Sequence, residues 1–273
     1  MNAVRKSAIA GSWYPGNPSV LRKDIEKYFQ AVTDMELEGD IVGIVAPHAG
    51  YVYSGQVAAY AYKLICGKKY DVIIIIGPSH RHAFHGVSIY GRGAYETPLG
   101  IVHVDDVLAL DIKALSKIVQ DIPAAHVQEH SVEIQLPFLQ VALGHFCFIP
   151  LVMGDQSVDT CRVLAEVIYQ ATRGKKTLIV GSSDLSHFHS YNEATKLDTI
   201  TLQHLKNADA EGLLQSLVAE DTEACGGGPM AVAMMAAQKM GANKAKFLKY
   251  ANSGDVTGDK SSVVGYTAAV YYK

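Results

Sequence analysis

The stretch VIIII at residues 72–76 consists of five consecutive β-branched side chains, and GPSH at residues 77–80 follows it directly. Branching at Cβ favours extended backbone and fits the surface of a sheet. A short apolar run that stops at Gly and Pro is typical of a strand covered on both faces, as the strands of a parallel sheet are. The stretch therefore predicts a central strand that ends close to His80.

Similar apolar runs occur on both sides of this strand, and segments with helical periodicity separate them. We expect further strands at residues 41–45, 87–90, 101–104, 146–152, 177–180, 246–250 and 264–272. We expect helices at residues 18–29, 56–65, 106–119, 131–143, 159–171, 193–207, 210–219 and 229–240. The turn at 97–100 suggests that 87–90 and 101–104 form a hairpin. The alternation predicts an α/β protein, a single three-layer α/β/α domain over residues 1–273 with a central mixed, mostly parallel sheet.

The composition narrows the function classes. Hydrophobic residues make up 49% of the 273 residues and charged residues 19%, which excludes a disordered chain. Lys and Arg number 24 against 27 Asp and Glu, so no basic excess favours nucleic acid or a membrane surface as a partner. Residues 1–10 lack the apolar core of a signal peptide, and no run approaches the ~20 apolar residues of a membrane-spanning helix. We expect a soluble, cytoplasmic protein.

Three of the predicted strands end in the same way, with small residues followed by a histidine. IVAPH ends at His48, IIGPSH ends at His80, and LIVGSSDLSH contains Asp184 and ends at His187. In an open α/β sheet, sites form at the carboxyl ends of the strands because the loops converge there. If the three strands are parallel neighbours, their histidines share one edge. A single histidine of this kind is usually an ordinary loop residue, but three in the same context indicate a functional site.

Cys225 lies in EACGGGPM, just before the helix predicted at 229–240. The partial positive charge of a helix N-terminus favours a thiolate, which could be a nucleophile or a metal ligand. The ordinary interpretation is a glycine-rich turn with an incidental cysteine. Two imidazoles and one thiolate suit iron(II), copper or zinc and disfavour magnesium and calcium. Cys66, Cys147 and Cys161 are interpreted as small buried residues, without the close spacing of a disulfide framework.

A further polar cluster, EHSVE at residues 129–133, begins the helix predicted at 131–143. Helix capping is the default role for Glu129 and Glu133. The alternative is that one of these carboxylates holds a ligating imidazole by its second nitrogen. The other histidines are not assigned to the site; they are His82, His85, His103, His126, His145, His189 and His204.

Six motifs in this order make the chain resemble the Memo family, of the AmmeMemoRadiSam system protein B type. They are AGSWY (10–14), APHAGY (46–51), GPSH (77–80), EHSVE (129–133), SSDLSH (182–187) and CGGGP (225–229). The resemblance extends from about residue 8 to the last predicted strand. Microbial members of the family are found alongside a radical SAM protein and a third partner family, and the animal relatives are mediators of cell motility. The resemblance therefore implies such partners here.

The Memo family is similar in fold to class III extradiol dioxygenases, which hold non-haem iron(II) with two His and one Glu. The resemblance implies His48 and His80 as metal ligands, Cys225 in place of the glutamate, and His187 as the catalytic acid–base. Asp184 would orient His187 or a metal-bound water. We expect a dioxygenase-like, metal-dependent redox protein with Fe(II), or else Cu or Zn. The thiolate makes metal binding a firmer expectation than ring cleavage.

Two other functions stay open. One is a module that keeps the fold and the pocket but only binds a peptide or a partner protein. The other is a metal- or cysteine-dependent hydrolase, although the sequence has neither a Gly-x-Ser-x-Gly elbow nor a His-Glu-x-x-His zinc motif. Trp13, Tyr14 and Tyr51 are candidates for the wall of a pocket that accepts a small organic ligand, and the alternative for each of them is an ordinary aromatic residue of the core.

Overall fold

Strand β3 (Val72–Pro78) lies at the centre of the sheet, as its sequence predicts. The computed structural model describes residues 4–33, 35 and 37–273, so residues 1–3, 34 and 36 of the predicted domain lie outside this part. β3 pairs in parallel with β8 (Cys147–Met153) on one side and with β9 (Thr177–Ser182) on the other. Every residue of β3 is buried. Because both faces are covered, the strand is continuously apolar rather than alternating.

The other strands extend the sheet outward from this parallel centre. β2 (Ile41–Ala46) is parallel to β9, and β12 (Val263–Tyr272) runs antiparallel to β2. The remaining strands are β1 (Val4–Arg5), β4 (Val87–Ile89), β5 (Ala94–Thr97), β6 (Gly100–Val104), β7 (Val119–Gln120), β10 (His187–His189) and β11 (Lys244–Asn252). Within the described residues they form one mixed sheet with the main order β1-β5-β6-β8-β3-β9-β2-β12-β10.

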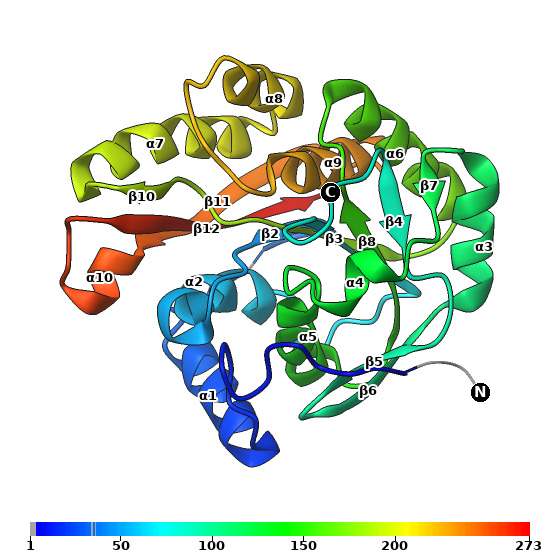
Figure 1. Ribbon diagram of the computed structural model, residues 1–273, viewed down its shortest axis with the longest axis horizontal. Coiled ribbons are helices and arrows are strands. Elements are labelled where there is room, and N and C mark those ends of the chain that lie inside the picture. The colour runs from blue at the N-terminus through cyan, green and yellow to red at the C-terminus, as the bar shows by residue number, and fades with distance from the viewer. Residues whose placement is uncertain (1–3, 34, 36) are drawn as a thin grey trace.

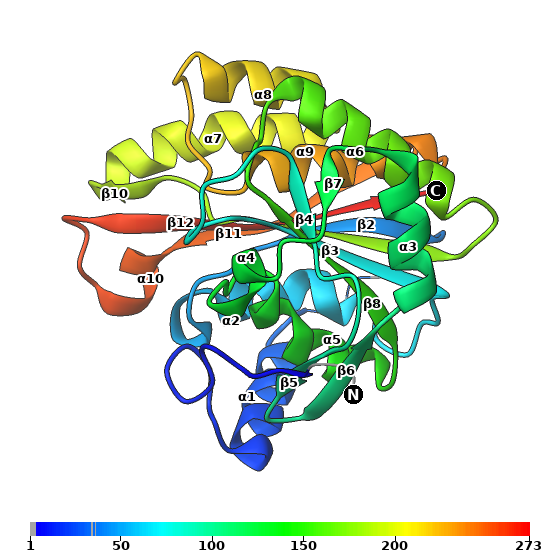
Figure 2. The ribbon, with the colours of Figure 1, turned by 45° about the vertical axis from the view of Figure 1, so that its right-hand side comes forward.

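Helices cover both faces of the sheet, which gives the three predicted layers (Figure 1). The helices are α1 (Pro18–Gln30), α2 (Tyr51–Lys63), α3 (Asp106–Leu115), α4 (Ala124–Val127), α5 (Leu136–Leu143), α6 (Val158–Ala171), α7 (Tyr191–Asn207), α8 (Ala210–Val218), α9 (Gly227–Lys239) and α10 (Ser253–Thr257). A 3₁₀ turn, η1 (Glu133–Gln135), precedes α5. Figure 2 shows α1, α2 and α5 on one side of the sheet and α6 to α9 on the other. The predicted fold class is confirmed.

The first helix shows how sequence pattern and packing agree. Its side chains Leu21, Ile25 and Phe29 recur every four residues and are buried on one face. Asn17 precedes Pro18 and accepts hydrogen bonds from two backbone N–H groups of the first turn, as its cap position predicts. By contrast, α9 is buried on nearly all sides because it packs against the sheet and against both α6 and α8.

Several details of the sequence interpretation are wrong. The helix predicted at 106–119 ends at Leu115, and Val119 belongs to β7. The hairpin around 97–100 joins β5 to β6, whereas β4 pairs with β7 and β8. The tyrosine-rich segment at 51–55 is helical, so α2 begins five residues before the predicted start. The helix predicted from 131 begins at Leu136, behind the 3₁₀ turn, because residues 129–131 form an irregular segment with its own side-chain hydrogen bonds.

Among the helices of the described residues, none combines the length and the apolar character that crossing a bilayer requires.

Candidate metal centre

The three strands that end in histidine are parallel neighbours in the order β3-β9-β2. In register, Ala46 at the end of β2 lies opposite Ser182 at the end of β9, and Gly181 lies opposite Ile76 of β3. The three strands therefore end at the same level, and their loops emerge at one edge of the sheet. The expected strand arrangement is confirmed.

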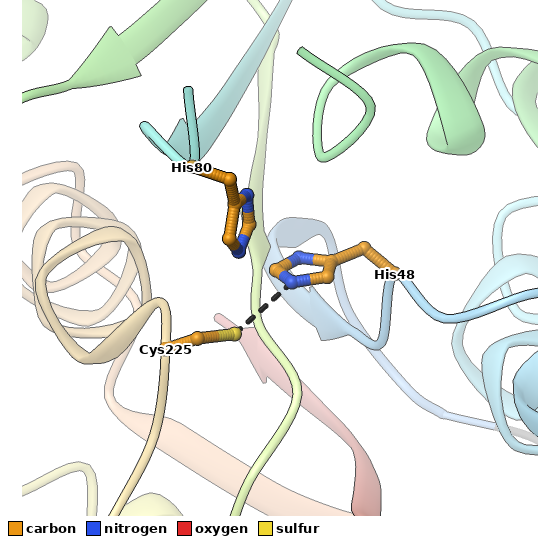
Figure 3. Close-up of side chains that lie close together, drawn as sticks. All are labelled: His48, His80 and Cys225. Atoms are coloured by element: carbon orange, nitrogen blue, oxygen red, sulfur yellow. Dashed lines mark hydrogen bonds between the residues drawn. The ribbon is translucent and has the colours of Figure 1, made fainter. Parts of the chain in front are cut away.

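This edge brings together two of the histidines and the predicted cysteine. His48, His80 and Cys225 each offer one ligand atom, and these atoms all lie within 4.8 Å of one another. Cys225 Sγ is 3.0 Å from His48 Nε2, and the ring centroids of His48 and His80 are 5.1 Å apart and nearly perpendicular (Figure 3). The three segments are remote along the chain. Their role as metal ligands stays a prediction, but such a cluster has the size that one ion requires.

His48 is buried at the site and held at both its backbone and its ring. Its backbone N–H donates to Asp184 Oδ1 at 2.7 Å, and its Nδ1 lies 3.0 Å from Ser182 Oγ. Burial lowers the pKa of His48 well below its usual value, and the neighbouring imidazoles of His130 and His80 lower it further. The ring is therefore neutral at pH 7, which is the form that binds metals.

His80 is held by Glu129 through two hydrogen bonds. Its backbone N–H donates to Glu129 Oε2 at 2.7 Å, and its Nδ1 lies 2.9 Å from Glu129 Oε1. Burial would raise the pKa of Glu129, but the hydrogen bonds from the ring and backbone of His80 and from the backbone N–H of Ser131 outweigh it and lower the pKa to about 2. An ionised carboxylate only accepts, so the Nδ1 of His80 donates and its Nε2 is free to bind. Glu129 thus orients the imidazole of His80, which is the alternative role, and the expected capping role is wrong.

Glu133 does not cap a helix either. It is fully buried and pairs with the guanidinium of Arg5 at 2.5 Å. Its carboxylate also accepts from Tyr14 Oη at 2.6 Å and from the backbone N–H of Ala8 at 2.9 Å. Arg5 donates further to the carbonyl of Glu129 at 2.6 Å. The chain's first described residues are therefore pinned to the segment that carries Glu129.

Cys225 lies in the loop before α9, and this loop is clamped by Gln156. The Gln156 amide donates to the Cys225 carbonyl at 2.9 Å and accepts from the backbone N–H of Gly228 at 2.8 Å. Gly226 is required because a Cβ there would lie 2.3 Å from the carbonyl oxygen of Ser182. The sequence gives no local signal for the role of Gln156, which lies 69 residues away.

Without a metal, the Cys225 side chain is a thiol. Burial raises the pKa of the Cys225 thiol far above its usual value, and the carboxyl of Asp184 adds to the effect. The expectation that the helix N-terminus favours a thiolate is therefore wrong for the metal-free protein. Desolvation of the half-buried Cys225 side chain outweighs the effect of the helix, since Cys225 lies one residue before the cap of α9.

His187 lies at the same edge but does not belong to the three-ligand cluster of the described residues. Its Nδ1 is 2.7 Å from the carbonyl of Leu185, and because a carbonyl only accepts, this nitrogen carries the proton. Nε2 is left as a proton acceptor. Asp184 does not orient the ring of His187, which was one of its expected roles. Its carboxylate accepts a hydrogen bond from the backbone N–H of His48 instead. Burial raises the pKa of Asp184 to about 7.

The aromatic residues differ in their distance from the site. Trp13 packs on His130 with ring centroids 4.3 Å apart, and His130 stacks on His80 at 4.5 Å. Tyr14 and Tyr51 are core residues whose hydroxyls donate to Glu133 and to the backbone, so their expected place in a pocket wall is wrong. Sequence reasoning gave His130 no separate role, although its neighbour Glu129 marks the segment.

One further histidine and the three other cysteines lie outside the cluster. His126 is buried between Ser88 and Tyr95, which confirms its structural interpretation. Cys161 is buried as expected, but Cys66 and Cys147 are exposed, so their interpretation as buried residues is wrong.

A cavity of about 650 Å³ opens beside Cys225 and His187. Its walls include the apolar side chains of Leu214 and Leu217 from α8, and Glu220 and Glu223 contribute carboxylates. Among the described residues that line it there is no lysine or arginine. Of the three clustered residues, Cys225 lines the cavity, and the charge of its lining favours neutral or cationic ligands over anions.

Comparison with known proteins places this geometry in a family. The family model described as Memo-like protein matches residues 5–270. A MEMO1 family protein of Sulfolobus acidocaldarius is 39% identical, with 96% of this chain and 97% of the relative covered. A MEMO1 family protein of Methanobrevibacter smithii is 37% identical, with coverages of 98% and 99%. One of Methanosarcina acetivorans is 38% identical, with 98% of each chain covered.

Proposed function

The chain belongs to the Memo-like family, and from this premise we propose that it is a metal-binding redox protein with a dioxygenase-like site. The observation that carries the proposal is the convergence of His48, His80 and Cys225, whose ligand atoms lie within 4.8 Å of one another although they come from three distant segments. Fe(II) is the metal we propose, with Cu or Zn as the alternatives.

The donor set supports a transition metal rather than magnesium or calcium. Two imidazole nitrogens and one sulfur are ligands of intermediate and soft character, whereas magnesium and calcium prefer oxygen. When bound, Fe(II) or Cu would supply a Lewis-acidic and redox-active centre with coordination positions left open for a ligand, whereas Zn would supply only the Lewis acid. The thiolate also makes the centre sensitive to oxidation.

The chain's own residues prepare and serve this centre. Glu129 orients the ring of His80 by accepting a hydrogen bond from its Nδ1, which leaves Nε2 available as a ligand. His187 offers Nε2 as a general base beside the cavity, because its Nδ1 proton is held by the carbonyl of Leu185. Burial lowers the pKa of His187, which keeps this nitrogen unprotonated at neutral pH.

The cavity beside Cys225 is the proposed entry for a small-molecule or peptide ligand. Its carboxylates argue against an anionic ligand at this position. A radical SAM protein and its associated partner are proposed as protein partners on the family relationship alone. Nucleic acid and membranes are not proposed as partners, and the proposed location is the cytoplasm.

The two other functions are less well supported. A cysteine-dependent hydrolase needs an activated thiolate, whereas burial raises the pKa of the Cys225 thiol. A pure binding module leaves the convergence of three ligand types unexplained. Such a module should keep its partner after metal removal and after His187→Ala, whereas an enzyme should lose activity in both cases.

Metal content after anaerobic purification tests the proposal. Wild-type protein should carry close to one equivalent of metal, and His80→Ala should lose most of it because a ligand is missing. His145→Ala is the matched control, since this histidine lies outside the cluster. Equal metal content in the wild-type protein and in His80→Ala would contradict the proposal.

Metal affinity should rise with pH. Because burial raises the pKa of the Cys225 thiol, a bound metal must displace one proton from the sulfur at neutral pH. His48 is already neutral and adds no such competition. We expect the apparent affinity for Zn²⁺ to increase ~tenfold from about pH 7 to about pH 8. Competition titrations would measure this slope, and a pH-independent affinity would contradict the assignment of the sulfur as a ligand.

A further inference from the structure

A chain of buried hydrogen bonds ends on the Nδ1 atom of His48. Tyr62 donates its hydroxyl proton to Gln135 Oε1 at 2.7 Å, and Gln135 Nε2 donates to Ser182 Oγ at 2.8 Å. Ser182 Oγ lies 3.0 Å from His48 Nδ1. All four side chains are buried, so water does not compete for these bonds. None of the three supporting residues belongs to the proposed ligand set.

The orientation of the Gln135 amide is determined by a backbone carbonyl. Its Nε2 also donates to the carbonyl of Pro47 at 3.0 Å. A carbonyl has no proton to give, so the group that faces both Pro47 and Ser182 is the NH₂ end of the amide. Gln135 is therefore a donor to Ser182 and cannot accept its proton.

The single hydroxyl proton of Ser182 is already used in another hydrogen bond. Ser182 Oγ donates to the carbonyl of Ser131 at 2.6 Å, and this carbonyl again can only accept. One lone pair of Ser182 Oγ accepts from Gln135. The remaining contact, with His48 Nδ1, can be a hydrogen bond only if the ring nitrogen is the donor.

We propose that Ser182, aligned by Gln135 and by the carbonyl of Ser131, is a positioning residue that fixes the proton of His48 on Nδ1. The Nε2 lone pair of His48 then faces Cys225, 3.0 Å away. The metal-binding role of this arrangement rests on the proposed function: a His48 ring that carries its proton on Nδ1 can bind a metal through Nε2. The tautomer itself is a property of the metal-free protein.

The same short segment prepares both imidazoles. Glu129 accepts a hydrogen bond from Nδ1 of His80. The carbonyl of Ser131 accepts the hydrogen bond that the Ser182 hydroxyl would otherwise donate to His48. Gly77 allows this segment to lie against β3, because a Cβ there would be 2.2 Å from Ser131 Oγ. The two residues that accept from the Nδ1 atoms differ in charge, since a carboxylate accepts from His80 and a neutral hydroxyl accepts from His48.

The tautomer can be measured directly in metal-free wild-type protein. Nitrogen-15 NMR of histidine-labelled protein distinguishes a protonated from an unprotonated ring nitrogen, and His48→Gln identifies the resonances of His48. We expect a neutral ring with the proton on Nδ1. A neutral ring with the proton on Nε2, or a charged ring at pH 7, would overturn the proposal.

Ser182→Ala tests the role of the hydroxyl. Without the Ser182 hydroxyl, Nδ1 of His48 loses the oxygen that accepts its proton, and the preference of the ring proton for Nδ1 over Nε2 should weaken. Zn²⁺ affinity should fall ~10–100-fold, the range for loss of a residue that orients a ligand. Ser88→Ala is the matched control, because Ser88 Oγ contacts His126 in the same way, at 3.0 Å, outside the site. An unchanged His48 tautomer in Ser182→Ala would overturn the proposal even if the affinity fell.

The two proposals fail in different ways. If the wild-type protein has the predicted tautomer but does not bind Zn²⁺, the positioning role stands and the metal-binding function fails. If the protein binds Zn²⁺ through its three ligands but His48 has the opposite tautomer, the positioning role fails and the function stands.

Discussion

Cys225→Ser should lower the affinity for Zn²⁺ by more than ~100-fold, beyond the effect of losing a residue that only orients a ligand. The sulfur is the one thiolate donor among the three atoms that converge at the carboxyl edge of the sheet. A serine hydroxyl keeps the size of the side chain but is a much poorer ligand, because it is not ionised at neutral pH. The two remaining imidazoles would leave the ion with too few protein ligands for tight binding.

Competition with a chromophoric chelator under anaerobic conditions would measure this loss. Cys66→Ser is the matched control, because Cys66 is exposed and lies outside the cluster. The control should retain wild-type affinity. Wild-type affinity in Cys225→Ser would show that the sulfur is not a ligand, and an equal loss in Cys66→Ser would point to a general effect of cysteine chemistry.

Glu133→Gln should destabilise the fold by about 3–5 kcal/mol, the cost of leaving one partner of a buried ion pair uncompensated. The change would leave the buried guanidinium of Arg5, which is 2.5 Å from the carboxylate, without its negatively charged partner. Burial would raise the pKa of Glu133, but Arg5 and the backbone N–H of Ala8 outweigh it and lower the pKa. The carboxylate therefore stabilises the protein above its unfolded-state pKa, and this contribution is lost as the pH falls through the folded-state pKa.

Urea denaturation of the wild-type protein and of Glu133→Gln would measure the difference. Glu166→Gln is the control, because Glu166 pairs with Lys239 at an exposed position, where ion pairs contribute little. The control should keep its midpoint. Equal midpoints for wild-type protein and Glu133→Gln would contradict the assigned role of Arg5 and Glu133. Because Arg5 also holds the carbonyl of Glu129, we expect the variant to bind metal less tightly before it unfolds.

The parallel centre of the fold and its edge were predictable because their signals are local. A short β-branched run such as VIIII favours a strand covered on both faces, and the repeated small residues before histidine place each ring just beyond a strand end. Parallel pairing then brings the ends of neighbouring strands to one level. These physical rules require no knowledge of contacts between distant residues.

The contact between a glutamate and a ligating imidazole was predicted only as an alternative, and the other supporting contacts were not predicted, because these contacts join segments far apart in the chain. Glu129 holds His80 across 49 residues, and Arg5 meets Glu133 across 128. Locally, a glutamate at the start of a helical pattern is indistinguishable from a cap. In the same way, the sequence shows that Cys225 precedes a helix but not how strongly the fold desolvates its sulfur, and this desolvation raises the pKa of the thiol.

X-ray absorption of zinc-loaded protein tests the central claim most directly, because it reports the atoms around the ion. The account predicts one sulfur at ~2.3 Å and at least two nitrogens at ~2.0–2.1 Å. The sulfur should disappear from the spectrum of Cys225→Ser. A zinc environment of oxygen and nitrogen alone in the wild-type protein would contradict the proposed centre.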